Sequence, residues 1–505
     1  MAKILGISAS LRNARLTSGS NLCSDLLEIK SKETLIKYLR DQGKLLVDSF
    51  LAENANGESY LLAFEKLRTR AKDQGLSNSE AALACGLWAS IQKKCSIDYL
   101  SLSRHFPPNG EVKFQDELTS KILKADGLLI SGPVYFGDRG SLVQSFIDFC
   151  HTNDEIKLHL QGKVYAGIAV GAKRNGGQET TLIYQMLDMA NMGMLSVGND
   201  TQTTSQYGGT AVAGDIGKLA EDNYGIDTCI STGNRIAHVA KIIKRKDSNI
   251  SQPIIKIQML VLQDNKNREG LSYFNKWAKK IGEIYPNVEI TLWDALSQKV
   301  IRCIGCDICP IDVGKAEEYR CIISSKDDFF AKNHEQLYDS DAILVCAYNP
   351  GNRKDMISVY QQYMERTRYI RRDNYLYSDV LVAPFVISEL SARQNMHLRI
   401  MTSMVRHQTI IHHPIIGIFN EGNFINEKTV SKYSENFIRT AIDIVGGRHK
   451  AESDLDNIYK PDGYVISREK TNIDIQTGKL QFFIDKKKQS MRIKRDKKIK
   501  GHIKL

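Results

Sequence analysis

Short apolar runs alternate with longer helical stretches along this chain, and this alternation limits the folds open to it. Ile4–Ile7 reads as a short buried strand that ends in the polar turn Ser8–Asn13. Further apolar runs predict strands at 125–131, 164–171 and 194–198, with helical spacing of apolar residues between them. Strands that alternate with helices are typical of a parallel sheet covered on both faces. The first half is therefore predicted to be a doubly wound α/β domain.

The same plan restarts after a polar linker at Arg245–Pro253. Strands are predicted in the second half at 255–262, 288–292, 342–345, 381–387 and 415–419. Asp341 precedes one of these runs as Asp126 precedes a run of the first half. Because 505 residues exceed one ordinary core, we interpret the pattern as an internal duplication. The predicted fold class is α/β, with two tandem doubly wound parallel-sheet domains, 1–246 and 254–447, and a C-terminal extension, 448–505.

The basic character of the chain is concentrated at its C-terminal end. The formal net charge is +11, and residues 486–505, with ten Lys or Arg and one Asp, carry +9 of it. The rest of the chain is nearly neutral, so the tail is interpreted as a solvated extension and nucleic acid is not expected as a partner. No apolar run is long enough for a membrane span, and the first residues are expected to form a strand rather than a signal peptide. A cytoplasmic location is expected, with the cysteines as thiols or metal ligands.

Three loops of the first half follow predicted strands, at the sheet edge where open α/β sheets bind ligands. The loop Ser8–Asn13 offers hydroxyls, N–H groups and the Arg12 guanidinium to an anion such as a phosphate. The loop Gly132–Gly137 holds a stiffening proline and two aromatic rings. In the loop Gly171–Gln178, paired glycines allow the backbone to approach a planar ring closely. Together these loops predict a site for FMN.

The loops resemble those of the NAD(P)H-dependent FMN reductases and the related iron–sulfur flavoproteins. The matching stretches are Gly6–Arg12, Ala125–Gly137 and Arg174–Thr180. The resemblance implies a flavodoxin-like fold, with Ser10 and Arg12 near the FMN phosphate and the isoalloxazine ring among the other two loops. The residues predicted to bind FMN are Ser8, Ser10, Arg12, Asn13, Pro133, Val134, Tyr135, Phe136, Arg174, Asn175, Gly176 and Gly177. One departure from the family is the long segment Lys30–Lys94, which we interpret as a lid or an interface.

The resemblance also implies an oxidoreductase that takes hydride from NAD(P)H and passes electrons to a small-molecule or protein acceptor. It supplies no catalytic acid or base. An electron carrier without its own substrate and a redox-sensing scaffold are the alternatives. Family members generally work as homo-oligomers, so the duplicated chain is expected to form an internal pseudo-dimer.

Four cysteines in the second half form a separate candidate site. They are Cys303, Cys306, Cys309 and Cys321. Four thiolates at such spacing can hold a 4Fe–4S cluster or zinc. The stretch Cys303–Cys309, with Asp327–Phe329 downstream, resembles the cluster region of iron–sulfur flavoproteins, although the gap before Cys321 is longer than usual there. A relic without metal stays a third interpretation.

The second half lacks the flavin loops of the first half, so no FMN is expected there. Gln263–Arg268 and Tyr348–Asn352 stand where the first half has its phosphate and ring loops. A helix with several arginines, among them Arg366, and several tyrosines is interpreted as exposed and salt-bridged. His412 and His413 point to opposite sides of an extended chain and are not expected to share a metal.

Overall fold

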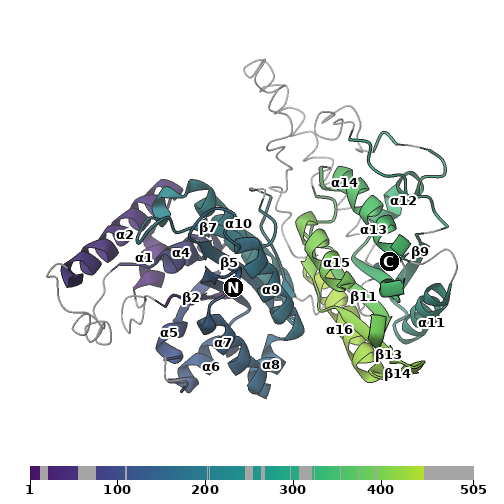
Figure 1. The fold of residues 1–505 in the computed structure, drawn as a ribbon, viewed down its shortest axis with the longest axis horizontal. Helices are drawn as coiled ribbons and strands as arrows, with labels where there is room; N and C mark the ends of the chain where they lie inside the picture. Colours follow the sequence, from purple (N-terminus) through teal and green to yellow (C-terminus); the bar gives the residue numbers. More distant parts are fainter. Residues whose placement is uncertain are drawn as a thin grey trace, which may run out of the picture. The chain divides into compact units, whose positions relative to one another are not determined.

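The structure is a computed structural model that divides the chain into two compact units, Met1–Lys244 and Arg245–Leu505. Figure 1 shows the helices and strands of both units. The described residues are 1–11, 21–54, 75–107, 111–201, 203, 205–244, 254–262, 268–295, 297–305, 321–323, 325–352, 354–372, 375–392 and 395–448. Within these ranges, no helix is long and apolar enough to cross a membrane.

Unit 1 is built on a parallel sheet with the strand order β2–β1–β3–β5, and β6 and β7 both pair with β5 on its outer side. The strands are β1 (Lys3–Ser8), β2 (Ser96–Ser101), β3 (Gly127–Tyr135), β5 (Val164–Gly171), β6 (Leu195–Ser196) and β7 (Gly209–Val212). The short β4 (Asp138–Arg139) pairs antiparallel with the end of β3. Counting β6 and β7 as one broken strand, the order is the 2-1-3-4-5 order of flavodoxin-like sheets.

Helices cover both faces of this sheet (Figure 1). They are α1 (Leu22–Glu28), α2 (Lys32–Asn54), α4 (Asn78–Gln92), α5 (Leu102–His105), α6 (Gln115–Leu123), α7 (Ser141–Thr152), α8 (Asp154–Leu160), α9 (Gln178–Asn191), the 3-10 turn η1 (Leu219–Glu221) and α10 (Asn223–Lys244). α4 is buried from Ser79 to Ser90 because it packs on the strands and on α10. The two helices approach so closely that a Cβ on Gly233 would lie 2.1 Å from the Gly86 carbonyl oxygen.

Unit 2 repeats the strand order as β9–β8–β10–β11, with β12 and β13 both paired to β11. The strands are β8 (Ile255–Leu262), β9 (Val288–Asp294), β10 (Ala342–Tyr348), β11 (Leu381–Glu389), β12 (Ile410–Ile411), β13 (Ile415–Asn420) and β14 (Asn423–Phe424). The helices are α11 (Glu269–Ile284), α12 (Phe329–Tyr338), α13 (Lys354–Arg366), α14 (Arg368–Arg372), α15 (Met396–Met404) and α16 (Glu427–Arg448). The predicted α/β class with flavodoxin-like parallel sheets is confirmed.

One polar contact recurs at the same point of both sheets. In unit 1, Asp126 just before β3 accepts a hydrogen bond from the Lys3 backbone N–H at 2.9 Å. Its carboxylate also pairs with Lys244, the last residue of α10, at 2.6 Å. The contact therefore ties the first strand, the third strand and the last helix of the unit together.

In unit 2, Asp341 occupies the equivalent place before β10. It accepts from the Lys256 backbone N–H at 3.0 Å and pairs with Arg448, the last residue of α16, at 3.2 Å. The two units therefore share both their strand order and this link through an aspartate.

Two strand predictions in unit 1 are corrected. The edge strand β2 was not predicted, because its sequence, Ser96–Ser101, is mostly half-buried and lacks an apolar run. The predicted strand 194–198 is wrong in extent, since β6 covers only Leu195–Ser196. After β6 the chain leaves the sheet and returns at β7. Asn199 closes the segment between them, because its Oδ1 accepts from Gly208 N at 3.0 Å.

Candidate functional site

The three predicted loops of unit 1 meet at the carboxyl edge of its sheet. Ala9, after β1, donates its backbone N–H to the Ser131 carbonyl of β3 at 2.8 Å. A Cβ on Gly177, after β5, would lie 2.8 Å from the Gly137 Cα in the turn after β3. The first loop thus contacts the end of β3, and the third loop contacts the second. The three loops follow neighbouring strands of the sheet.

The first loop contributes buried hydroxyl groups. Ser8 and Ser10 are 0% and 5% exposed, and Arg12 and Asn13 lie outside the described residues. Ser8 is paired in register with Ser131, whose Oγ donates to the Ser79 carbonyl at 2.8 Å. The first turn of α4 therefore lies beside this loop.

The start of α4 was not among the predicted site residues. Ser77 caps the helix, and its Oγ accepts from Glu80 N while Glu80 accepts from Ser77 N. Such a helix N-terminus favours a phosphate group. The signal was present as the capping box Ser77–Glu80 before an apolar run, but more than sixty residues separate it from Ser10 in the sequence.

Glu80 is also held by the half-buried Tyr99. The Tyr99 hydroxyl donates to its carboxylate at 2.6 Å. Burial, and then the charge of Glu80, raise the pKa of Tyr99 well above its ordinary value. Tyr99 consequently keeps its proton and stabilises the carboxylate that completes the cap of α4.

The second loop presents two aromatic side chains. Pro133 and Val134 are half-buried, whereas Tyr135 is 43% exposed and Phe136 is fully exposed. Phe136 has a φ of 52°, in the left-handed region that bulky residues rarely adopt. Strained positions of this kind cluster at ligand sites, and an exposed ring here can lie against a planar ligand.

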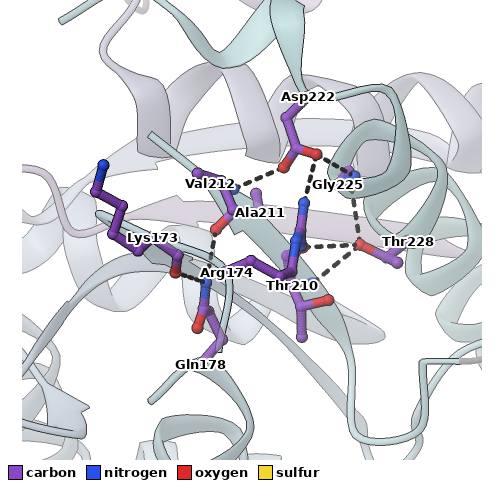
Figure 2. A network of polar contacts seen from close by, with 9 residues as sticks. All are labelled: Lys173, Arg174, Gln178, Thr210, Ala211, Val212, Asp222, Gly225 and Thr228. Atoms are coloured by element: carbon purple, nitrogen blue, oxygen red, sulfur yellow. Dashed lines mark hydrogen bonds and ion pairs between the residues drawn. The ribbon is translucent and has the colours of Figure 1, made fainter. Parts of the chain in front are cut away.

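The third loop is folded back on itself by Gln178, the first residue of α9. Its Oε1 accepts from Gly176 N at 2.8 Å. Its Nε2 donates to the Lys173 carbonyl at 2.8 Å (Figure 2). Asn175 and Gly177 are both left-handed, with φ of 60° and 96°. The turn is therefore tight and leaves its backbone at the edge of the site.

Arg174 fastens this loop to β7 and to the start of α10. Its Nη1 donates to the Thr210 carbonyl at 2.6 Å, and its Nη2 pairs with Asp222 (Figure 2). The guanidinium also lies over the Tyr224 ring, 5.0 Å from its centre. Asp222 in turn accepts from Val212 N at 2.7 Å. A direct contact of Arg174 with FMN stays a prediction.

The long segment predicted as a lid or an interface contains α2. Its middle lies against the loop after β7, because a Cβ on Gly43 would stand 2.2 Å from the Gly217 carbonyl oxygen. Asn78 of α4 donates to the Asp215 carbonyl in the same loop at 2.8 Å. The segment thus supports a loop at the carboxyl edge of the sheet.

Aromatic side chains gather at the corresponding edge of unit 2. Tyr348, at the end of β10, lies near the rings of Tyr273 and Phe419, with centroids 6.3 and 6.1 Å apart. A Cβ on Gly270 would meet the Tyr348 Cβ at 2.6 Å. This packing supports the expectation that unit 2 holds no FMN, which stays a prediction.

The cysteine segment is described at its two ends. Cys303 and Cys321 are half-buried, and Cys306 and Cys309 lie outside the described residues. The Gly305 N–H donates to Cys303 Sγ at 3.4 Å, with Gly305 left-handed at a φ of 64°. Such an N–H contact suits a thiolate ligand. Within the described residues no three metal-ligating side chains form a group.

In the arginine- and tyrosine-rich helix region of unit 2, the predicted exposure is wrong for Arg366 and the neighbouring tyrosines, whereas a salt bridge is present as predicted. Arg366, Tyr363 and Tyr369 are each 1–2% exposed. Arg366 forms a two-point ion pair with Asp328, with N–O distances of 2.9 and 2.8 Å. The burial of Arg366 could not be predicted from the run of Arg and Tyr residues, because the sequence does not show that Asp328 is its buried partner.

Comparison with known proteins agrees with this geometry. Residues 84–208 match the family model described as NADPH-dependent FMN reductase. An iron–sulfur flavoprotein of Methanocaldococcus jannaschii is 37% identical over 130 residues, which are 26% of this chain and 66% of that protein. An iron–sulfur flavoprotein of Methanosarcina thermophila is 30% identical over 131 residues, 26% of this chain and 64% of that protein. The matches thus span just under two thirds of these relatives.

Solved structures are also similar to the chain. A WrbA-like flavodoxin from Agrobacterium tumefaciens is 12% identical, with 48% of this chain and 98% of that chain covered and a TM-score of 0.25. The strand order and the edge loops define unit 1 as a flavodoxin-like α/β domain. Within that domain, residues 84–208 are similar in sequence to the NADPH-dependent FMN reductases.

Proposed function

We propose that unit 1 binds one FMN and that the chain uses it to oxidise NAD(P)H and reduce an acceptor. The observation that carries this proposal is the meeting of three loops at the carboxyl edge of a flavodoxin-like sheet. Bound FMN would supply the hydride and electron chemistry itself. The part of the chain is to bind the cofactor and hold its ring beside the nicotinamide.

The fit of unit 1 to FMN rests on complementary groups. A phosphate would receive hydrogen bonds from the hydroxyl groups of Ser8 and Ser10 and from the N–H groups at the start of α4. Arg12 follows Ser10 closely in the sequence and would add a positive charge. The exposed Phe136 offers an apolar face to the ring. The tight turn at Asn175–Gly177 offers backbone N–H groups to its polar edge. These residues would fix the ring and leave one of its faces for the nicotinamide.

We further propose that the four cysteines of unit 2 hold an iron–sulfur cluster that accepts electrons from FMN. The names of the two archaeal relatives support an iron–sulfur group, and the N–H contact to Cys303 supports a thiolate. Zinc and a metal-free relic stay open. Metal and sulfide analysis of anaerobically purified protein distinguishes them: iron with sulfide supports the cluster, and stoichiometric zinc contradicts it.

The two units share their strand order, and Asp126 in unit 1 makes the same contacts as Asp341 in unit 2. Both observations support an origin of the units by duplication. We retain 1–246, 254–447 and 448–505 as the proposed domains. The acceptor is proposed only as a class, a small molecule or a protein. An electron carrier without its own substrate is the second candidate, because the names of the relatives give two redox groups, iron–sulfur and flavin, and no substrate.

Steady-state oxidation of NADH and NADPH tests the proposal. FMN-loaded protein is expected to consume one of these with a quinone or free flavin as acceptor. If the flavin is bound but neither nicotinamide reduces it, the electron-carrier function is supported instead. If the protein binds no FMN, both functions are excluded.

A further inference from the structure

The most deeply buried ion pair in the described part of unit 2 joins Arg366 to Asp328. Their side chains are 1% and 0% exposed. Arg366 ends α13, and Asp328 caps α12 by accepting from Ala331 N at 3.1 Å. The Arg366 guanidinium also lies over the Phe330 ring, 5.0 Å from its centre. The pair is therefore enclosed and its geometry is fixed.

This pair holds both ends of the cysteine segment. Arg366 Nη1 donates to the Ile301 carbonyl at 2.7 Å, and Nη2 reaches the Ile323 carbonyl at 3.5 Å. Asp328 Oδ1 also accepts from Ile301 N at 3.2 Å. Ile301 lies two residues before Cys303, and Ile323 lies two residues after Cys321. One ion pair thus fixes the chain where it enters and where it leaves the segment.

Stability alone is a poor explanation for such a pair. Taking both charges out of water costs several kcal/mol per ion, and apolar replacements of buried pairs are often as stable. A buried pair is better suited to specifying one arrangement of the chain. Here the pair brings the backbone at Ile301, next to Cys303, close to the backbone at Ile323, next to Cys321.

Unit 1 provides an internal comparison. Its helices α6 and α7 stand before and after β3 as α12 and α13 stand before and after β10. The residue before α6 is Phe114, which makes no side-chain cap, and the basic residue in the last turn of α7 is the exposed His151. No cysteine occurs between Leu102 and Asp126. The ion pair and the cysteines thus occur together, in unit 2.

We propose that Arg366 and Asp328 are positioning residues that bring Cys303 and Cys321 together as ligands of one metal centre. This inference rests on the proposed metal-binding role of the cysteines. Arg366 does not touch the metal in this proposal; it acts through the backbone at Ile301 and Ile323. Removing the two-point contact of the Arg366 guanidinium should therefore loosen the metal site while the sheet of unit 2 remains folded.

The test compares Arg366→Lys and Arg366→Met with Arg448→Met. The lysine variant keeps the charge but cannot form the two-point contact. Arg448→Met is the matched control, because it breaks another largely buried Arg–Asp pair of unit 2, the one that ties Asp341 before β10 to the end of α16. Iron and sulfide, or zinc, are added anaerobically to metal-free protein. Metal content, chelator competition and the melting of the metal-free proteins are then measured.

Both Arg366 variants are expected to bind the metal about 10- to 100-fold more weakly, as is typical when a supporting contact of a metal site is lost. Arg448→Met should keep the metal affinity of the original protein even if its melting temperature falls. Original affinity in both Arg366 variants overturns the inference. Equal losses in Arg366→Met and Arg448→Met also overturn it, because general destabilisation then suffices. If the unsubstituted protein binds neither iron nor zinc, the metal role of the cysteines fails first and this inference falls with it.

Discussion

Gly177 stands against Gly137 so closely that a Cβ on Gly177 would lie 2.8 Å from the Gly137 Cα. The first residue follows β5 and the second follows β3, so the contact joins two loops of the proposed ring site. Gly177 also has a φ of 96°, which a side chain rarely accepts. The contact makes Gly177 a sensitive place to test whether the loops form a single site.

Gly177→Ala should weaken FMN binding by about tenfold or more, corresponding to about 1.4 kcal/mol, because the two loops must separate. Gly162→Ala is the control, since Gly162 has a φ of 75° and a Cβ there would meet nothing within 4 Å. Both variants should lose about 1–2 kcal/mol of stability from backbone strain. Fluorescence titration with FMN measures the difference. Equal FMN affinities in the two variants would show that the loop contact is irrelevant to the cofactor.

Asp222→Asn should loosen the loop that Arg174 fastens to β7 (Figure 2). The side chains of Arg174 and Asp222 are 37% and 12% exposed, so the loss should be modest, about 1 kcal/mol or roughly fivefold in FMN affinity. Lys218→Met removes an exposed pair with Glu221 nearby in the chain and should leave the affinity unchanged. An Asp222→Asn protein with unchanged affinity would limit Arg174 to a structural role.

Acid should destabilise unit 2 through its buried histidines. Burial lowers the pKa of His407 to about 3 and that of His412 to about 4, whereas the unfolded chain takes up protons near the ordinary value of about 6.5. The folded state therefore binds fewer protons, and its stability falls as the pH drops below about 6.5. Each ring should cost roughly 2 kcal/mol near pH 5.

Thermal melting between about pH 7 and pH 5 checks this expectation. His407→Gln should reduce the pH dependence, because glutamine can keep a hydrogen bond to Thr367, which His407 contacts at 3.0 Å. His159→Gln serves as a control for the substitution itself, because His159 belongs to unit 1 and the melting of unit 2 is measured. A melting temperature of unit 2 that is constant over this range would mean that these rings are hydrated in the folded protein.

The alternation of strands and helices was enough to predict the fold, because buried central strands such as β3 and β5 are nearly continuous apolar runs. The edge strand β2 was missed, since a strand exposed along one side needs no such run. Local motifs also identified the loops that meet at the sheet edge. The start of α4 was not recognised as part of the site, because a long segment separates Ser77 from Ser10. Arg366 was misjudged because burial of a charge depends on a partner, Asp328, that only the fold brings close.

The most direct measurement of the central claim is the FMN stoichiometry of the purified chain, together with its dependence on the phosphate loop. One FMN per chain is expected. Arg12→Ala combined with Ser10→Ala should weaken its binding by roughly 1.5–3 kcal/mol or more, the value of a charged hydrogen bond. Two flavins per chain, no flavin at all, or an affinity unaffected by the double substitution would contradict an FMN site in unit 1.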